Sequence, residues 1–244
     1  MRLLLLNGNT DPAITALIAT RAAEALPRLG LPPAELVPVT APFGARYIST
    51  RAAVAIAGHA VLAALADHIG RDNPAGCDAA IIACFGEPGI EAARELLPIP
   101  VVGMAEASIA AALAIAPRVA LLTGGALWVP MLEEFVLIRG FGPDQVMVRG
   151  IAPTGDMIAR DPDGAAALLA EAAQAAAAEG AGAVVLGGAG LAGIAPRVAP
   201  LVSVPVLDSL DCALAAALGG GAARERVAQA PMVGVSDDLR RWFA

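Results

Sequence analysis

Aromatic and charged residues are scarce in this chain. Phe, Trp and Tyr make up only 3% of its 244 residues and charged residues 16%, whereas 57% are hydrophobic. No apolar run reaches the roughly eighteen residues that a membrane-spanning helix needs, and the leucine run after Met1 is too short for a secretion signal. We therefore expect no membrane partner and interpret the leucine run as a buried strand.

Basic charge, cysteine and histidine are scarce as well. Sixteen Lys and Arg against 23 Asp and Glu give a net charge of −7, which disfavours nucleic acid as a partner. The three cysteines are an odd number without paired spacing, as is typical of a reducing cytoplasm rather than of a disulfide framework. Two histidines and three scattered cysteines form no cluster of metal ligands. The sequence thus predicts a cytoplasmic protein without a bound metal.

Short apolar runs alternate along the chain with helical patterns. The expected strands are "RLLLLN", "CDAAIIAC", "PVVGM", "RVALLTG", "AGAVVLGG" and "PVLD". Among the expected helices, one begins after Asp11 as N-cap with Pro12 in its first turn, and a short one is opened by Pro88. Strands that alternate with helices predict an α/β fold with a mostly parallel sheet flanked by helices.

The series of runs occurs twice. Three pairs of segments align residue by residue: 2–9 with 118–125, 79–86 with 183–190, and 100–113 with 205–218. Self-similarity at such a long period indicates two copies of one α/β unit rather than a solenoid. The second alignment sets Cys84 opposite Gly188.

Two copies predict two pseudo-symmetric lobes. We expect residues 1–104 with 209–244 to form lobe one, which carries Cys84, and residues 105–208 to form lobe two, which carries Gly188. The oligomeric state stays open, with a homo-oligomer as one alternative.

A G-x-G-x-x-G pattern at Gly188, Gly190 and Gly193 follows an apolar run and is typical of dinucleotide-binding turns. Two features argue against a dinucleotide. Pro196 and Pro200 interrupt the long helix that such a turn needs, and the pattern lies late in the chain rather than at its start. We therefore expect no cofactor, and interpret the turn as the second copy of the "CFGEPG" turn.

Four Gly-rich turns follow expected strands, and ligands of parallel sheets bind at the carboxyl ends of strands. Backbone N–H groups at such turns bind carboxylate or enolate oxygens. Asn7, Asn9, Thr10 and Thr123 add side-chain donors, and Gly124 belongs to the same strand end as Thr123. This set of donors suits a small anionic substrate.

Cys84 is the one reactive group at these strand ends. A thiol before a helix N-terminus is expected to have a lowered pKa, because the helix dipole favours the thiolate. The alternative is a buried structural cysteine, which is common. Cys77 and Cys212 are interpreted as packing residues.

Several motifs resemble one known family: "NGNT" near the start, "YIST" at 47–50, "ACFGEPGIEAAREL" with "PVVGMAEA", and "VVLGGAG" with "PVLD". They are similar to the aspartate/glutamate/hydantoin racemase superfamily, above all to its hydantoin and allantoin racemase branch. The resemblance implies an isomerase with its active site between two lobes and no cofactor. It also implies one cysteine per lobe, so that one thiolate removes the α-proton of the substrate and the opposite thiol returns a proton.

The resemblance matches individual residues of this chain to functional positions of the family. Cys84 matches the first catalytic cysteine, whereas the second is replaced by Gly188. Asn9 and Thr123 match positions that line the substrate pocket. The remaining candidates are Phe85, Gly188 and Ala189, whose backbone N–H groups match those that face the substrate, and Tyr47, a candidate surrogate acid or base.

Three functions stay open. The first is a racemase acting at the acidic Cα–H of a small hydantoin- or amino-acid-like substrate, with Cys84 as acid and base. The second is a one-sided enzyme with Cys84 as proton donor, a mirror arrangement of arylmalonate decarboxylase in the same superfamily. The third is a non-catalytic protein that binds a small anion.

Overall fold

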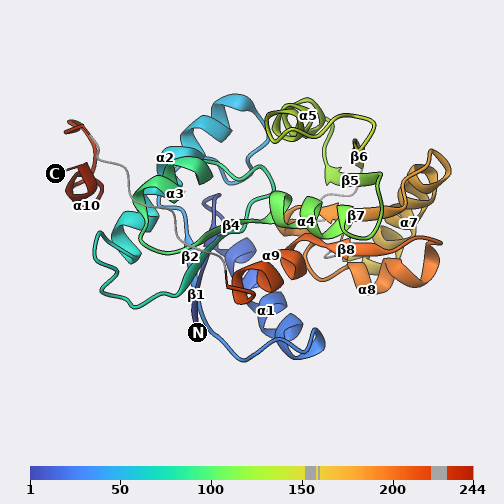
Figure 1. Cartoon of the computed structure of the whole chain (residues 1–244), viewed down its shortest axis with the longest axis horizontal. Coiled ribbons are helices and arrows are strands. Elements are labelled where there is room, and N and C mark those ends of the chain that lie inside the picture. The colour runs from blue at the N-terminus through green and yellow to red at the C-terminus, as the bar shows by residue number, and fades with distance from the viewer. Residues whose placement is uncertain (152–157, 159, 221–229, 244) are drawn as a thin grey trace. The chain divides into compact units, whose positions relative to one another are not determined.

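The computed structural model describes residues 1–151, 158, 160–220 and 230–243 (Figure 1). The chain divides into two compact units. Unit 1 comprises Met1–Gly103 with Ala213–Ala244, and unit 2 comprises Met104–Cys212. Each unit contains one four-stranded sheet in which every strand pairing is parallel.

The sheet of unit 1 has the order β2-β1-β3-β4. Its strands are β1 (Arg2–Asn7), β2 (Glu35–Thr40), β3 (Ala79–Ile82) and β4 (Val101–Gly103). Its helices are α1 (Pro12–Arg28), α2 (Arg51–His68), α3 (Ile90–Leu96) and, near the C-terminus, α10 (Asp237–Arg240) followed by the 3₁₀ turn η3 (Arg241–Phe243). β1 and β3 are buried almost throughout, so helices must cover both faces of this sheet.

The core of unit 1 follows from the alternation of side chains along β1. Leu4 and Leu6 pack into one cluster with Val61 and Leu65 of α2. Leu3 and Leu5 point to the opposite face, and α1 packs against β1 and β2. Since every one of the four leucines is fully buried, the run "LLLL" is the strand at the centre of an α/β unit.

The sheet of unit 2 has the order β6-β5-β7-β8. Its strands are β5 (Val119–Gly124), β6 (Val146–Ile151), β7 (Ala183–Gly187) and β8 (Val206–Asp208). Its helical elements are α4 (Met104–Leu113), α5 (Trp128–Ile138), α7 (Pro162–Ala178), η1 (Ala189–Leu191), α8 (Ala195–Val198) and η2 (Ala199–Leu201). α9 (Ser209–Leu218) follows β8 directly and continues from unit 2 into unit 1.

The strand registers repeat between the two units. Leu3 pairs with Ala79 in unit 1, and Val119 pairs with Ala183 in unit 2. These are corresponding positions of the aligned segments. The next pair, Ala80 with Val101, likewise corresponds to Val184 with Val206. The predicted fold class, a parallel α/β fold in two similar copies, is therefore confirmed.

Local expectations have mixed outcomes. Asp11 caps α1 as predicted, because its side chain accepts a hydrogen bond from the N–H of Ala13, and Pro12 is the first helical residue. The prediction that Pro88 opens α3 is wrong. The helix begins at Ile90, after Gly89 at φ 76°, a left-handed conformation that glycine adopts without steric cost. The strands β2 and β6 and the helix α5 were not predicted from the sequence.

No helix in the described part of the chain is both long enough and apolar enough to cross a membrane.

We predict that Gly89→Ala destabilises the protein strongly. A Cβ at this position would lie 2.9 Å from the carbonyl oxygen of Gly58 in α2, in addition to the strained φ of 76°. The conformation alone costs about 1–2 kcal/mol and overpacking adds about 1–3 kcal/mol. Gly30→Ala is the matched control, since Gly30 has φ 64° but nothing within 4 Å of its Cβ position. Urea unfolding should show the larger loss for Gly89→Ala, and equal losses would contradict the close contact.

Candidate active site

Three loops of unit 1 meet at Cys84, two residues after the end of β3. These loops lie close together at Gly8. A Cβ built on Gly8 would lie 3.4 Å from the Cβ of Cys84, 3.5 Å from Pro88 and 3.7 Å from Ile48. The loops after β1, β2 and β3 thus converge at the carboxyl edge of the sheet, where parallel sheets bind ligands.

The turn from Cys84 to Gly89 is held by its own backbone. The N–H of Glu87 donates to the carbonyl oxygen of Cys84 at 2.9 Å, and the N–H of Ile90 donates to that of Glu87 at 3.2 Å. Glu87 has φ 47°, a conformation that costs a non-glycine residue about 1–2 kcal/mol. A strained acidic residue in so short a turn indicates that its position is imposed by the surroundings.

The expectation of an activated thiolate at Cys84 is not met. Burial raises the pKa of Cys84 to about 11; the Glu87 carboxylate raises it further, and the backbone N–H groups of Gly86 and Glu87 oppose the rise. Only part of the predicted effect of a helix dipole on Cys84 remains, because α3 has only seven residues and begins six positions after Cys84. Cys84 is nevertheless partly exposed. It therefore presents a protonated thiol near neutral pH.

Tyr47 lies in the same unit as Cys84 and interacts with it electrostatically. Burial raises the pKa of the Tyr47 phenol, and the Cys84 charge raises it further. The side chain still has 58% of its surface exposed. Tyr47 is thus a neutral hydroxyl beside the thiol.

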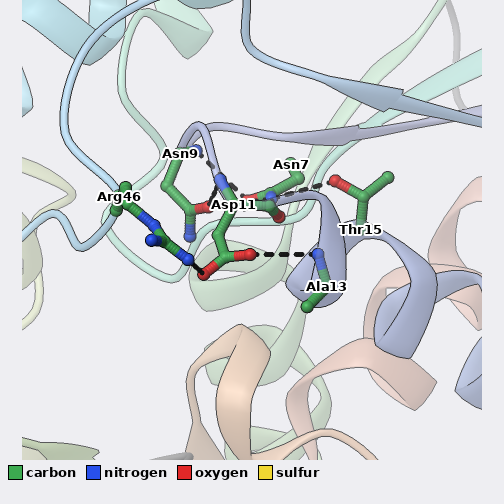
Figure 2. Close-up of polar contacts among 6 residues, drawn as sticks. All are labelled: Asn7, Asn9, Asp11, Ala13, Thr15 and Arg46. Carbon is green, nitrogen blue, oxygen red and sulfur yellow. Dashed lines mark hydrogen bonds and ion pairs between the residues drawn. The ribbon is translucent and has the colours of Figure 1, made fainter.

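Figure 2 shows that Asn7 organises the loop after β1. Its Nδ2 donates to the Oδ1 of Asn9 at 2.9 Å, to the carbonyl oxygen of Asp11 at 3.0 Å and to the Oγ1 of Thr15 at 3.0 Å. In return, its Oδ1 accepts the N–H of Asn9 at 3.1 Å. The expectation that Asn7 donates to the substrate is therefore wrong, because its amide N–H groups are engaged in holding this loop.

Asn9 is placed differently. Its Oδ1 accepts hydrogen bonds from Asn7 and from the N–H of Asp11, at 2.8 Å for the latter. These two contacts fix the orientation of the amide, and its Nδ2 makes no hydrogen bond to the described residues. The Nδ2 of Asn9 is accordingly a pre-oriented donor at the edge of the sheet.

The loop after β2 is tied to the same turn. Arg46 forms an ion pair with Asp11 at 2.9 Å (Figure 2), which lowers the pKa of the Asp11 carboxyl. The N–H of Thr10 donates to the carbonyl oxygen of Ala45 at 3.1 Å. These contacts hold the segment that carries Tyr47 next to Asn9 and Thr10.

Unit 2 repeats this edge with a glycine in place of the cysteine. Thr123, at the end of β5, is buried and pairs with Gly187 at the end of β7. Gly188 corresponds to Cys84; its N–H donates to the Oγ of Ser209 at 3.4 Å. Gly188 has φ 137°, and a Cβ built on it would meet nothing within 4 Å. The position has space for a side chain, although its backbone conformation disfavours one.

Asp208, the last residue of β8, fixes the turn that contains Gly188. Its carboxylate accepts the N–H of Gly193 at 2.6 Å and the N–H of Leu210 at 2.9 Å. Burial raises the pKa of Asp208 to about 6, with a further rise from the Asp211 charge, although the backbone N–H donors oppose the rise. The Asp208 carboxylate therefore accepts hydrogen bonds from backbone N–H groups of unit 2.

The dinucleotide interpretation finds no support in this geometry. The turn at Gly188 leads into the three-residue 3₁₀ turn η1 rather than into a long helix with an open N-terminus. α8, which follows, has only four residues. Within the described ranges, no group of three His, Cys, Asp or Glu side chains could hold a metal ion either.

The predicted site residues therefore fall into two sets. Asn9, Thr10, Tyr47 and Phe85 lie in unit 1 with Cys84. Thr123, Gly124, Gly188 and Ala189 lie at the edge of the sheet in unit 2. Sequence reasoning assigned no role to Glu87, because nothing in the "CFGEPG" pattern indicates that its acidic side chain is 97% buried, with a relative exposure of 3%.

Comparison with known proteins gives the family. Residues 3–217 match the model of the Asp/Glu/Hydantoin racemase family, so the chain belongs to this family. It is 36% identical over 156 residues to a hydantoin racemase of Rhizobium meliloti. This match covers 62% of the chain and 65% of that relative, so the chain spans a little under two thirds of its length.

Solved structures agree with this assignment. The allantoin racemase from Klebsiella pneumoniae has a TM-score of 0.85 at 27% identity, over 98% of this chain and 99% of that one. The allantoin racemase from Pseudomonas fluorescens has a TM-score of 0.81 at 29% identity, over 90% of both chains. The predicted resemblance to the hydantoin and allantoin racemase branch is thus confirmed.

We predict that Asp208 makes stability depend on pH between about 4 and 6. The folded pKa of about 6 exceeds the unfolded value of about 3.9, so the native state binds the proton more tightly. This contribution is complete below the unfolded pKa and is lost as the pH rises through the folded one. At 1.36 kcal/mol per unit, the loss is at most about 3 kcal/mol.

Urea unfolding at several pH values should show a smaller decline for Asp208→Asn than for the wild type. Asp163→Asn is the control, because it removes an exposed carboxylate that pairs with Arg197. If the wild type and Asp208→Asn decline in parallel, the protonation of Asp208 plays no part.

Proposed function

We propose that the protein is a cofactor-independent isomerase that acts at the acidic Cα–H of a small hydantoin- or amino-acid-like substrate through an enolate. Membership of the racemase family supports the class of reaction. The observation that carries the proposal is the position of Cys84 at the carboxyl edge of the unit 1 sheet, partly exposed and beside loops rich in hydrogen-bond donors. Cys84 is then the catalytic acid and base.

The surroundings of Cys84 suit a substrate with a carbonyl or carboxylate oxygen. The Nδ2 of Asn9, which makes no hydrogen bond to the described residues, is a donor in the same unit, and the hydroxyl of Tyr47 is a second candidate. In unit 2, Thr123 and the N–H groups of Gly188 and Ala189 are the corresponding candidates for substrate contacts. We further propose that units 1 and 2 are the two lobes implied by the resemblance, and that a small anionic molecule is the only ligand required.

The raised pKa of Cys84 favours a second candidate, a one-sided proton-transfer enzyme such as a decarboxylase. With a pKa of about 11, only about one thiol in 10⁴ is ionised at pH 7, so removal of a Cα proton by the thiolate starts from a rare form. The abundant thiol is suited to donating a proton. Loss of CO₂ from a malonate-type substrate would generate the enediolate without a base, and Cys84 would then protonate one face.

We predict that Gly188→Cys increases racemisation of a 5-substituted hydantoin by up to about 10²–10⁴-fold, the usual gain from a general acid or base. The space at the Cβ position admits the side chain, and the backbone φ of 137° is expected to make the variant less stable. Gly188→Ala is the matched control, since it brings the same backbone strain without a thiol. Equal racemisation by the two variants would contradict a role for position 188.

Deuterium incorporation at Cα in D₂O separates the candidates. An isomerase with a second base incorporates deuterium with inversion, whereas one-sided chemistry incorporates it with retained configuration. Cys84→Ser should lower either activity by at least about 10²-fold, because the hydroxyl is a much weaker acid. Measurement on a hydantoin, allantoin, an amino acid and an arylmalonate tests both classes. Incorporation that is unchanged in Cys84→Ser would overturn both, and its absence with every substrate supports a binding protein.

A further inference from the structure

Glu87 is a buried carboxylate that the proposed chemistry does not use. Its relative exposure is 3%, and its backbone has the positive φ of 47° described above. A charged group is seldom buried unless its surroundings require it, since burial removes its hydration. The charge of this carboxylate acts on the Cys84 thiol.

The place of the carboxyl group is defined by Gly103, the last residue of β4. A Cβ built on Gly103 would lie 2.1 Å from the carboxyl carbon of Glu87 and 2.2 Å from its Oε1. The carboxyl group thus fills the space in which the first side-chain atoms of residue 103 would lie. Only glycine at position 103 leaves that space open.

The second unit has a carboxylate at the corresponding place, from a different part of the chain. Gly103 aligns with Asp208, the last residue of β8, because segments 100–113 and 205–218 match. The carboxyl carbon of Asp208 is one bond, about 1.5 Å, from its own Cβ. Each unit therefore has a carboxyl group over the end of its fourth strand, supplied in unit 1 by the turn that carries Cys84.

This arrangement couples the carboxylate to the thiol. Glu87 lies three positions after Cys84, and the N–H of Glu87 donates to the carbonyl oxygen of Cys84. The negative charge of Glu87 opposes ionisation of the thiol, and Tyr47 is the other titratable group that interacts with Cys84. Among the described residues, the charge that acts on this thiol is that of Glu87 rather than that of a cationic side chain.

We propose that Glu87 is a positioning residue for Cys84: its carboxyl group, seated against Gly103, anchors the 84–89 turn, and its negative charge adds to the effect of burial in keeping the thiol protonated as a proton donor. The inference rests on the proposed function insofar as Cys84 acts on substrate. The effect of Glu87 on the ionisation of the Cys84 thiol can be tested without any substrate.

The test is the pH dependence of Cys84 alkylation by iodoacetamide, followed by mass spectrometry of the peptide that contains residue 84. In Glu87→Gln, which keeps the shape and removes the charge, the apparent pKa should fall. The thiolate fraction at pH 8 should then rise about tenfold for each unit of that fall, and the alkylation rate should rise by somewhat less because a less basic thiolate is a weaker nucleophile. An unchanged or raised apparent pKa would overturn the proposal.

A transplanted carboxylate separates charge from simple loosening of the turn. Glu87→Ala opens the space, and adding Gly103→Asp returns a carboxyl group to it as in unit 2, whereas adding Gly103→Asn returns the same shape without charge. The Asp double variant should have the higher apparent pKa of the two, close to that of the wild type. Equal values in the two double variants would mean that the charge has no effect, and would overturn the inference.

Circular dichroism identifies any variant that does not fold. If the double variants do not fold, the comparison of Glu87→Gln with the wild type still decides the proposal. The rate of deuterium incorporation completes the experiment. If alkylation behaves as expected but no substrate exchanges, the proposed function fails and the role of Glu87 stands. If substrates exchange but the apparent pKa does not respond to residue 87, only the role of Glu87 fails.

Discussion

The parallel pairing of β3 with β1 is the constraint on which the candidate site depends. It brings the residues after both strands to one edge of the sheet, so that Cys84 lies against Gly8. Because both strands are buried, the turn after β3 can present its thiol only at that edge. The same packing withdraws water from the sulfur, which is the largest cause of its raised pKa. Position and protonation state of the thiol thus have a common physical origin.

The two units show how a repeated fold can diverge at its strand ends while its register is kept. Corresponding pairs such as Leu3 with Ala79 and Val119 with Ala183 are preserved. At the turn after the third strand, one copy has a thiol and the other has Gly188, held by Ser209. A carboxylate over the fourth strand is present in both copies, although it comes from Glu87 in one and from Asp208 in the other. Such divergence is what a change from two-sided to one-sided proton transfer would require.

Much of the fold could be predicted from the sequence, because it depends on local sequence patterns. The buried run "LLLL", the Asp-Pro start of α1 and the internal repeat each have a strong local signal, and the fold class followed from them. β2 and β6 have mixed burial and weaker patterns, so they escaped notice. The sequence predicts a lowered pKa for Cys84, whereas the pKa is raised, because it depends on the surrounding atoms and on the start of α3 at Ile90. Burial of Glu87 depends on the missing side chain of Gly103, a contact between distant positions that no local motif records.

The central claim is that Cys84 is a partly exposed thiol that stays protonated near neutral pH. Thiolate absorbance in the ultraviolet measures this in a protein whose other cysteines have been replaced by Cys77→Ser and Cys212→Ala, after subtraction of the same titration of its Cys84→Ser variant, which removes the signal of the Tyr47 phenolate. The account predicts that the absorbance of the folded protein rises only as the pH approaches about 11. A rise centred at or below about 8.5, the value of an ordinary cysteine, would contradict it.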